Sequence, residues 1–260
     1  MAAIQLAVTE YGAGPPLAIL HGLFGSGRNW RSIAQRLAAR HRVLTFDLRN
    51  HGTSPWAEGM SYGEMVEDLR ASLSAHGNTH TALLGHSMGG KVAMLTALLY
   101  PAEVDRLVVV DIAPAANPPA LLAYVRAMRT ADLRGVTRRG DVDARLAETV
   151  HDPAERAFLL QNLIIDEGTA RWRLNLDAIE RDFPEIVGFP PLPAGTAYRG
   201  PTLFVAGARS GHIRPAHEPG IRQLFPRARI ARIEEAGHWV HAEQPQAFLQ
   251  AVEAFLSAGE

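Results

Sequence analysis

Short apolar runs alternate in the first part of the chain with longer stretches whose apolar side chains recur every three or four positions. The short runs at 17–20, 43–46, 81–84 and 107–110 predict buried strands. The run at 107–110 (LVVV) has no polar position, which is typical of a strand covered on both faces of a parallel sheet. Stretches at 29–39, 61–76 and 91–100 have the helical period, and Ser61 with Glu64 fits a capping box. This alternation predicts an α/β protein with a mostly parallel sheet.

The alternation stops at Pro114 and resumes near residue 200. Between these points only helical patterns occur, at 121–128, 141–150, 153–165 and 174–181. Proline clusters at 118–119 and 190–193 stand on either side of these helical patterns. Strands are expected again at 202–205 and 230–233, with helices at 214–225 and 245–256. We therefore predict a core domain formed by residues 1–113 and 200–260, with a helical cap inserted at 114–199.

The composition narrows the possible functions. Of the 260 residues, 47% are hydrophobic and 20% are charged, and the formal net charge is −1, as in an ordinary globular protein. The basic residues, of which Lys91 is the single lysine, are scattered, so no nucleic-acid partner is expected. The absence of cysteine excludes disulfides and thiolate chemistry. The N-terminus has no signal-peptide pattern and no apolar run is long enough to span a bilayer, so a cytoplasmic protein is expected.

The segment 85–89 (GHSMG) fits G-x-S-x-G, the nucleophile elbow. The expected strand at 81–84 enters it and the expected helix leaves it, which is the strand–turn–helix context that the motif requires. The turn is tight enough that Gly85 and Gly89 must lack side chains. The N-terminus of the following helix directs partial positive charge at a developing oxyanion. We therefore expect Ser87 to be a nucleophile.

A serine hydroxyl is a weak nucleophile at neutral pH and needs a general base. His238 follows the expected strand at 230–233 and precedes the last helix, in a loop that Gly237 allows to turn sharply. We expect His238 to be the base, with His241 as the alternative.

The tetrahedral intermediate of acyl transfer needs two backbone N–H donors. One is expected from Met88, the residue after the serine. The other is expected from the loop at 21–26 (HGLFGS), which follows the first buried strand. Leu23 is the candidate in that loop, and Phe24 is the second choice.

Three segments, 21–26 (HGLFGS), 47–54 (DLRNHGTS) and 84–94 (LGHSMGGKVAM), resemble the α/β-hydrolase superfamily. More narrowly, they resemble its branch of small bacterial and mitochondrial serine esterases with a GHSMGG elbow and an RNHG segment. The resemblance covers nearly the whole chain, including 110–114 (VDIAP) and 172–176 (WRLNL). It implies an eight-stranded sheet, a helical cap and hydrolysis of short- to medium-chain acyl esters or thioesters.

The acid that orients the histidine departs from the superfamily's usual pattern. An aspartate usually follows the strand after the cap, but here Ser210 occupies that position. A serine cannot carry the charge that stabilises an imidazolium. Asp111 ends the preceding strand of the sheet, at 107–110, and is the expected acid, with Ser210 as a possible hydrogen-bonding helper. A turn-capping role is the alternative for Asp111, and an ordinary loop hydroxyl is the alternative for Ser210.

Four residues, Phe24, Trp172, Asn175 and Trp239, are expected to contact the substrate, and a core role is the alternative for Trp172. The segment at 47–52 is expected to form a buried polar turn beside the site. No metal-ligand spacing involves Asp47, His51 or His212, and neither a metal nor another cofactor is expected.

These residues predict a serine carboxylesterase with a Ser-His-Asp triad and an acyl-enzyme intermediate. Two alternatives remain open. A hydrolase of carbon–carbon bonds can use the same triad, and a non-catalytic ligand-binding protein can retain it. If the protein is a carboxylesterase, the expected partner is its substrate, a small acyl ester or thioester. The sequence does not define its acyl length or the oligomeric state.

Overall fold

The computed structural model describes residues 3–166 and 168–258. Residues 1–2 and 259–260 of the predicted core domain lie outside the described residues. Residues 1–2 also begin the N-terminal segment in which no signal peptide is expected. Within the described part, the main sheet has seven strands in the order β1-β3-β2-β4-β5-β8-β9. All neighbours pair in parallel except β1 with β3. The strands are β1 (Val8–Tyr11), β2 (Pro16–Leu20), β3 (Arg42–Phe46), β4 (Thr81–His86), β5 (Val104–Val110), β8 (Thr202–Gly207) and β9 (Ala228–Ile233).

The expectation of an eight-stranded sheet is wrong, since the described residues form seven strands. The segment before β1 shows why no further strand forms at this end. The N–H groups of Ile4, Leu6 and Ala7 donate to side chains, at 2.8, 2.9 and 2.8 Å, respectively, instead of to a neighbouring strand. The acceptors are the side chains of Asp68, Ser72 and Ser54. These three N–H groups are therefore satisfied without a strand partner.

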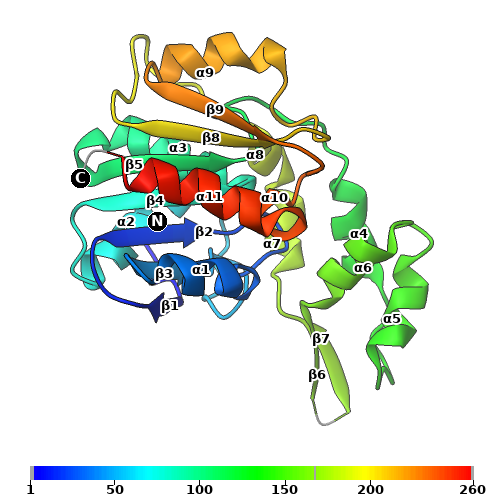
Figure 1. Ribbon diagram of the computed structural model, residues 1–260. Coiled ribbons are helices and arrows are strands. Elements are labelled where there is room, and N and C mark those ends of the chain that lie inside the picture. The colour runs from blue at the N-terminus through cyan, green and yellow to red at the C-terminus, as the bar shows by residue number, and fades with distance from the viewer. Residues whose placement is uncertain (1–2, 167, 259–260) are drawn as a thin grey trace.

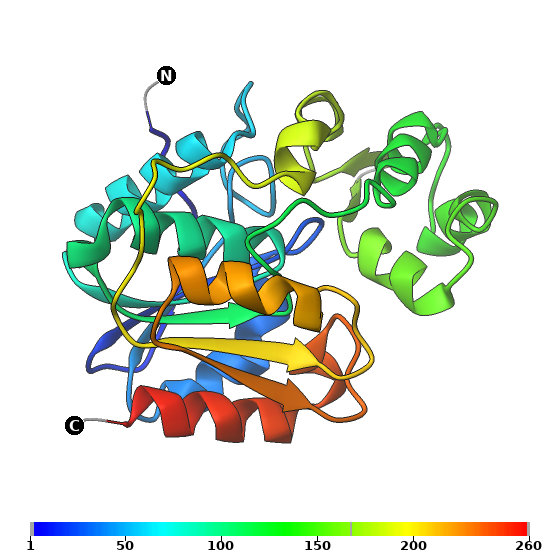
Figure 2. The same ribbon diagram turned by 90° about the horizontal axis from the view of Figure 1, so that it is seen from above.

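Helices cover both faces of the sheet (Figure 2), with α11 on one side and α3 and α9 on the other. The α-helices of the core are α1 (Arg31–Leu37), α2 (Tyr62–Ala75), α3 (Met88–Leu99), α9 (Glu218–Leu224), α10 (Val240–Glu243) and α11 (Pro245–Leu256). Short 3₁₀ helices are η1 (Gly27–Trp30), η2 (Pro101–Glu103) and η3 (Pro215–His217). The predicted capping box is present, because Ser61 and Glu64 each bond the other's backbone N–H at the start of α2.

The continuous apolar runs divide between two cores because successive side chains of a strand point to opposite faces. In β5, Leu107 and Val109 join the core on the α3 side, whereas Val108 and Val110 join the core on the α11 side. All four side chains are fully buried. A strand of this kind has no solvent face, which explains why its sequence contains no polar alternation.

The chain between β5 and β8 lies beyond the carboxyl ends of the parallel strands, where the arrowheads point (Figures 1 and 2). We call residues 114–199 the inserted segment. It contains α4 (Leu122–Thr130), α5 (Arg139–Leu146), α6 (Pro153–Leu160), β6 (Leu163–Asp166), β7 (Thr169–Trp172), α7 (Leu176–Arg181) and α8 (Phe183–Val187).

The inserted segment is not purely helical, so that expectation is wrong. The helix expected at 153–165 ends at Leu160, and β6 pairs with β7 as an antiparallel hairpin. Two local features explain the change. The side chain of Asn162 donates to the carbonyl oxygens of Leu159 and Phe24, which takes the chain out of the helix. Gly168, just before β7, has a φ of 81°, a conformation that glycine adopts readily in a turn.

Lys91 connects the core to the inserted segment. Its Nζ, on α3, donates to the carbonyl oxygens of Val187 and Gly188 at 2.8 and 2.6 Å, at the C-terminal end of α8. The hydroxyl of Tyr62 donates to the neighbouring carbonyl of Ile186 at 2.7 Å. Burial lowers the pKa of Lys91 to about 8.

No helix within residues 3–166 and 168–258 is long and apolar enough to cross a membrane.

The segment at 47–52 forms a polar turn around a buried ion pair. Arg49 Nε lies 2.6 Å and Nη2 2.9 Å from the two carboxylate oxygens of Asp68 on α2. Arg49 is 2% exposed and Asp68 is fully buried. Arg49 also contacts Glu64 at 3.0 Å. Removing one member of a buried ion pair is costly, because the charge of the other member stays away from water.

We therefore expect Asp68→Asn to lower the free energy of unfolding by about 3–5 kcal/mol. Urea unfolding followed by circular dichroism measures this loss. Glu10→Gln, which removes the partner of Arg42 from a partly exposed ion pair, is the matched control and should cost far less. Equal losses in the two variants would show that the buried pair has no special role in stability.

Candidate active site

Ser87 stands between β4 and α3, at the point where the motif predicts a sharp turn. Its φ of 51° and ψ of −117° are strained for a residue with a side chain. A Cβ atom at Gly85 would collide with the carbonyl oxygen of Gly89, and one at Gly89 would collide with that of His21. Glycine is therefore required on both sides of the serine. Ser87 itself is only partly buried.

Asp111 and His238 lie side by side at the carboxyl edge of the sheet. Asp111 directly follows β5 and is fully buried, and its Oδ2 lies 2.8 Å from Nδ1 of the partly exposed His238. Since a carboxylate only accepts hydrogen bonds, Nδ1 carries the proton and Nε2 is left as the basic nitrogen. This arrangement is the one that a general-base histidine requires.

Two further donors hold the Asp111 carboxylate. Ser210 Oγ donates to Oδ2 at 2.5 Å, and the N–H of Gly207 donates to Oδ1 at 3.0 Å. Both donors lie on or just after β8, which pairs in parallel with β5. Adjacent parallel strands end about 5 Å apart at the same edge, so a side chain that ends β5 reaches the loop after β8.

The alternative base, His241, occupies a different environment. Its ring stacks on Trp30, with centroids 3.9 Å apart, and its buried Nδ1 has no hydrogen-bond partner in the described part of the chain. Burial lowers the pKa of His241 to about 3. His238, and not His241, therefore contacts a carboxylate.

The 21–25 loop packs directly against Ser87. A Cβ atom built on Gly22 would lie 3.2 Å from that of Ser87. The N–H of Phe24 already donates to His51 Nε2 at 3.3 Å, whereas the N–H of Leu23 makes no such bond to the residues that the structure describes. Met88 is the first residue of α3, where a backbone N–H has no acceptor within the helix. Of the two candidates in the loop, Leu23 is thus the one with a free donor.

Sequence reasoning assigned no role to two further histidines that contact the His238 loop. The Nε2 of His86, the residue before Ser87, lies 2.9 Å from the carbonyl oxygen of His238. Burial lowers the pKa of His86 well below its usual value, so the ring is neutral. His212 stacks on His238 with centroids 4.0 Å apart. Only their positions, one beside Ser87 and one after Ser210, could have pointed to them.

The four residues expected to contact the substrate are placed differently. Phe24 is buried in the loop beside Ser87, and Trp239 is half-buried and packs against Phe158 of α6, with ring centroids 5.5 Å apart. Trp172 is buried in the inserted segment, where its Nε1 donates to Met128. Asn175 caps α7 and its side-chain amide donates to the 47–57 region. For Trp172 and Asn175 these contacts are structural, and substrate contact stays a prediction.

One cluster near the site has the chemistry of metal ligands, although no sequence spacing predicts it. One ligand atom each from Asp111, His212 and His238 lies within 4.8 Å of the other two. The Asp111 oxygens already accept hydrogen bonds from Ser210, Gly207 and His238. Hydrogen bonding around the carboxylate therefore accounts for Asp111 and His238, and His212 joins them by stacking on His238.

Buried histidines make the fold sensitive to acid. Burial lowers the pKa of both His51 and His241 to about 3. In the unfolded chain the same groups titrate near pH 6.5, so below that pH the unfolded chain binds more protons than the folded one. The stability that comes from neutral rings is fully present above pH 6.5 and is lost as the pH falls toward about 3.

We expect the free energy of unfolding to fall by roughly 1 kcal/mol per buried histidine when the pH drops from about 7.5 to about 5.5. Urea titrations at the two pH values measure this difference. His241→Gln should remove one such contribution, whereas His80→Gln, at a site 65% exposed, should not. The same acid loss in both variants would contradict the assignment.

A serine in a strained elbow, a carboxylate–histidine pair and a parallel sheet covered on both faces together define an α/β hydrolase. The sequence profile described as "alpha/beta hydrolase fold" matches residues 15–245, and the chain belongs to this family. It is a hydrolase enzyme, since curated relatives in this family are named as lipases and esterases.

Two relatives and one solved structure illustrate the similarity. The Mus musculus "sn-1-specific diacylglycerol lipase ABHD11" is 42% identical over 251 residues, which cover 94% of this chain and 81% of that protein. "Esterase YbfF" of Escherichia coli is 33% identical over 246 residues, which cover 93% of each chain. The solved structure of a "Marine microorganism esterase" has a TM-score of 0.93 and 36% identity, and the match covers 97% of this chain and all of that one.

Proposed function

We propose that the protein is a serine carboxylesterase that hydrolyses short- to medium-chain acyl esters, and thioesters of the same acyl groups, through an acyl-enzyme intermediate. The observation that carries this proposal is the 2.8 Å contact between Asp111 Oδ2 and His238 Nδ1, at the sheet edge where Ser87 stands in the elbow. Relatives named as esterases and as a diacylglycerol lipase support acyl-ester chemistry.

In the proposed first step, Nε2 of His238 takes the Ser87 proton as the hydroxyl oxygen bonds to the acyl carbon. The carbonyl oxygen becomes an oxyanion, which the N–H groups of Leu23 and Met88 bind. Each such donor contributes about 3–4 kcal/mol in comparable sites. The imidazolium formed on His238 is stabilised by the Asp111 carboxylate.

In the proposed second step, His238 returns the proton to the departing alcohol or thiol, and the acyl group remains on Ser87. A water molecule then loses a proton to His238 as its oxygen attacks the acyl carbon. The second tetrahedral intermediate collapses to release the carboxylic acid and to restore the Ser87 hydroxyl. Ser210 is proposed to hold the Asp111 carboxylate in place throughout.

We further propose that residues 114–199 act as a cap that limits the length of the acyl group. The support is their place beyond the carboxyl ends of the strands and the packing of Phe158 of α6 against Trp239, next to His238. Residues 1–113 and 200–260 are then the catalytic core.

An acyl-length series tests this function. p-Nitrophenyl esters from acetate to dodecanoate, and thioesters of the same acids, are offered to the purified protein. We expect kcat/KM to peak at short to medium chains and to fall at the longest ones. Dienone substrates in the same panel test carbon–carbon hydrolysis. Turnover of dienones without turnover of esters would replace the proposal with that alternative, and labelling of Ser87 by a fluorophosphonate without any turnover would favour a ligand-binding protein.

A further inference from the structure

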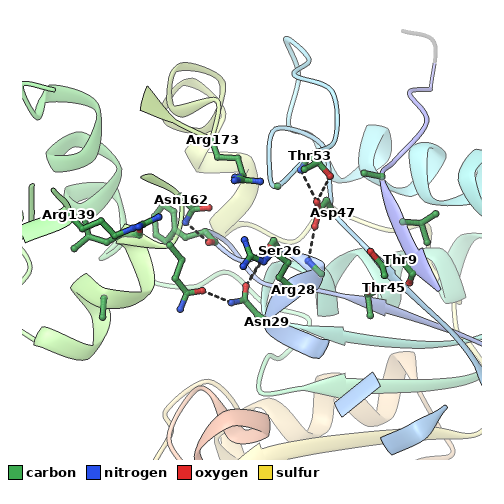
Figure 3. Close-up of a pocket in the computed structure, with 18 residues that line it drawn as sticks. Thr9, Ser26, Arg28, Asn29, Thr45, Asp47, Thr53, Arg139, Asn162 and Arg173 are labelled. Carbon is green, nitrogen blue, oxygen red and sulfur yellow. Dashed lines mark hydrogen bonds between the residues drawn. The ribbon is translucent and has the colours of Figure 1, made fainter. Parts of the chain in front are cut away.

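A cavity of about 530 Å³ lies between the core and the inserted segment (Figure 3). The core contributes Phe24 of the 21–25 loop and residues of η1, β1 and β3, and the inserted segment contributes residues of α5 and α6 and the chain after β7. Ser87, Asp111 and His238 do not border it. The proposed chemistry therefore leaves this cavity without an assigned role.

Three arginines border this cavity: Arg28 from η1, Arg139 from the start of α5 and Arg173 just after β7. In the described part of the chain, no carboxylate oxygen lies within ion-pair distance of any of the three guanidinium groups. Elsewhere arginines do pair: Arg156 lies 2.8 Å from Asp143, and Arg42 lies 2.8 Å from Glu10. The cavity thus gathers positive charge in a chain whose net charge is −1.

Among the described residues, the one carboxylate that borders the cavity is Asp47, and it already accepts three hydrogen bonds. It accepts from the N–H of Gly27 at 2.7 Å, from the N–H of Thr53 at 2.7 Å and from the hydroxyl of Thr53 at 3.0 Å (Figure 3). Three guanidinium groups against one carboxylate leave the lining with excess positive charge.

The arginines also keep donors free for a ligand. Arg139 is anchored, because its Nε and Nη2 donate to the carbonyl oxygens of Leu160 and Leu163 at 3.3 and 3.0 Å. Within the described residues, the side chains of Arg28 and Arg173 make no hydrogen bond. A guanidinium presents its N–H groups as a planar fork, which matches the oxygens of a phosphate group better than it matches any neutral ligand.

We propose that this cavity binds a phosphate group, carried by the leaving group of the substrate. The assignment to a leaving group rests on the proposed esterase function. Phe24 connects the two places: it follows Leu23, a proposed oxyanion donor, and its carbonyl oxygen accepts a hydrogen bond from Asn162 of the cavity lining at 2.8 Å. The proposal places the leaving group of an acyl group at Ser87 along this loop, which packs against Ser87 and extends toward the cavity.

Matched substrates test the proposal and separate two sources of such a phosphate group, a coenzyme A thioester and a phosphate-bearing lipid ester. Butyryl-coenzyme A is compared with butyryl-N-acetylcysteamine, which has the same thioester and no phosphate. Dihexanoyl phosphatidic acid is compared with dihexanoylglycerol. We expect at least one phosphate-bearing partner to be preferred at low salt, with the preference falling as salt is added.

The variant Arg28→Gln/Arg173→Gln should lose about tenfold or more in kcat/KM for the preferred phosphate substrate, through KM, and should hydrolyse its neutral partner as before. Arg31→Gln and Arg171→Gln, exposed arginines outside the lining, are the matched controls and should change neither. A phosphate preference that is absent, or that survives the double variant, overturns the proposal.

Binding to the inactive Ser87→Ala protein separates this proposal from the esterase function. Coenzyme A and glycerol 3-phosphate are titrated calorimetrically into Ser87→Ala, with and without the two arginine changes. Binding of either probe that weakens about tenfold in the double variant supports phosphate binding in the cavity. If the protein then hydrolyses no ester, only the esterase proposal fails. No arginine-dependent binding of either probe overturns the phosphate site, whatever esters the protein hydrolyses.

Discussion

Replacing Ser87 by alanine is expected to lower kcat for ester hydrolysis by about 10⁴-fold or more. The change removes the atom that bonds to the acyl carbon, so that only direct attack of water in the remaining site is left. The fold should persist, because the tight turn depends on Gly85 and Gly89 and not on the serine hydroxyl. Initial rates on a p-nitrophenyl ester measure the loss, and circular dichroism checks the fold.

Ser74→Ala, on the exposed side of α2, is the matched control and should keep full activity. Activity of Ser87→Ala within about tenfold of the wild type, in a preparation free of other hydrolases, would remove Ser87 from the mechanism.

Asp111→Asn is expected to cost up to about 10⁴-fold in kcat, with much of the shape of the site kept. The hydrogen bonds explain the size of this effect. The N–H of Gly207 requires an acceptor at Oδ1, so the asparagine oxygen faces Gly207 and its NH₂ group faces His238 Nδ1. The imidazole must then accept at Nδ1 and carry its proton on Nε2. In that tautomer His238 cannot take a proton from Ser87.

Ser210→Ala removes one hydrogen bond from the same carboxylate and leaves its charge in place. The activation free energy is expected to rise by about 1.5–3 kcal/mol at most, since a hydrogen bond to a charged group contributes about that much. Both variants are assayed at one pH with one ester. A larger loss for Ser210→Ala than for Asp111→Asn would reverse the roles of the two residues.

The positions of strands and helices around the candidate site could be predicted from local patterns. The apolar run before Asp111 and the glycines on both sides of Ser87 are patterns of residues that are close in sequence. The structure has β5, β4 and α3 at these places. The proximity of Asp111 to the loop after β8 could also be predicted, because the carboxyl ends of parallel strands lie at one edge of the sheet.

Other features depend on contacts that are distant in sequence. The hairpin β6–β7 replaces a helical pattern after Asn162 bonds to Phe24, 138 residues away along the chain. The strand count was taken from a resemblance, whereas in this chain the residues before β1 bond to side chains. The arginine-lined cavity combines Arg28 with Arg139 and Arg173, residues that no local pattern connects.

The central claim is that Ser87 forms a covalent intermediate, and the most direct test is to trap it with a fluorophosphonate. Trypsin releases the serine in a peptide spanning 71–91, since Arg70 precedes it and Lys91 is the first basic residue after it. Mass spectrometry should find one adduct per chain, on Ser87, forming at the same rate as ester hydrolysis is lost. An adduct on another residue, or full ester hydrolysis after Ser87 is completely labelled, would contradict the account.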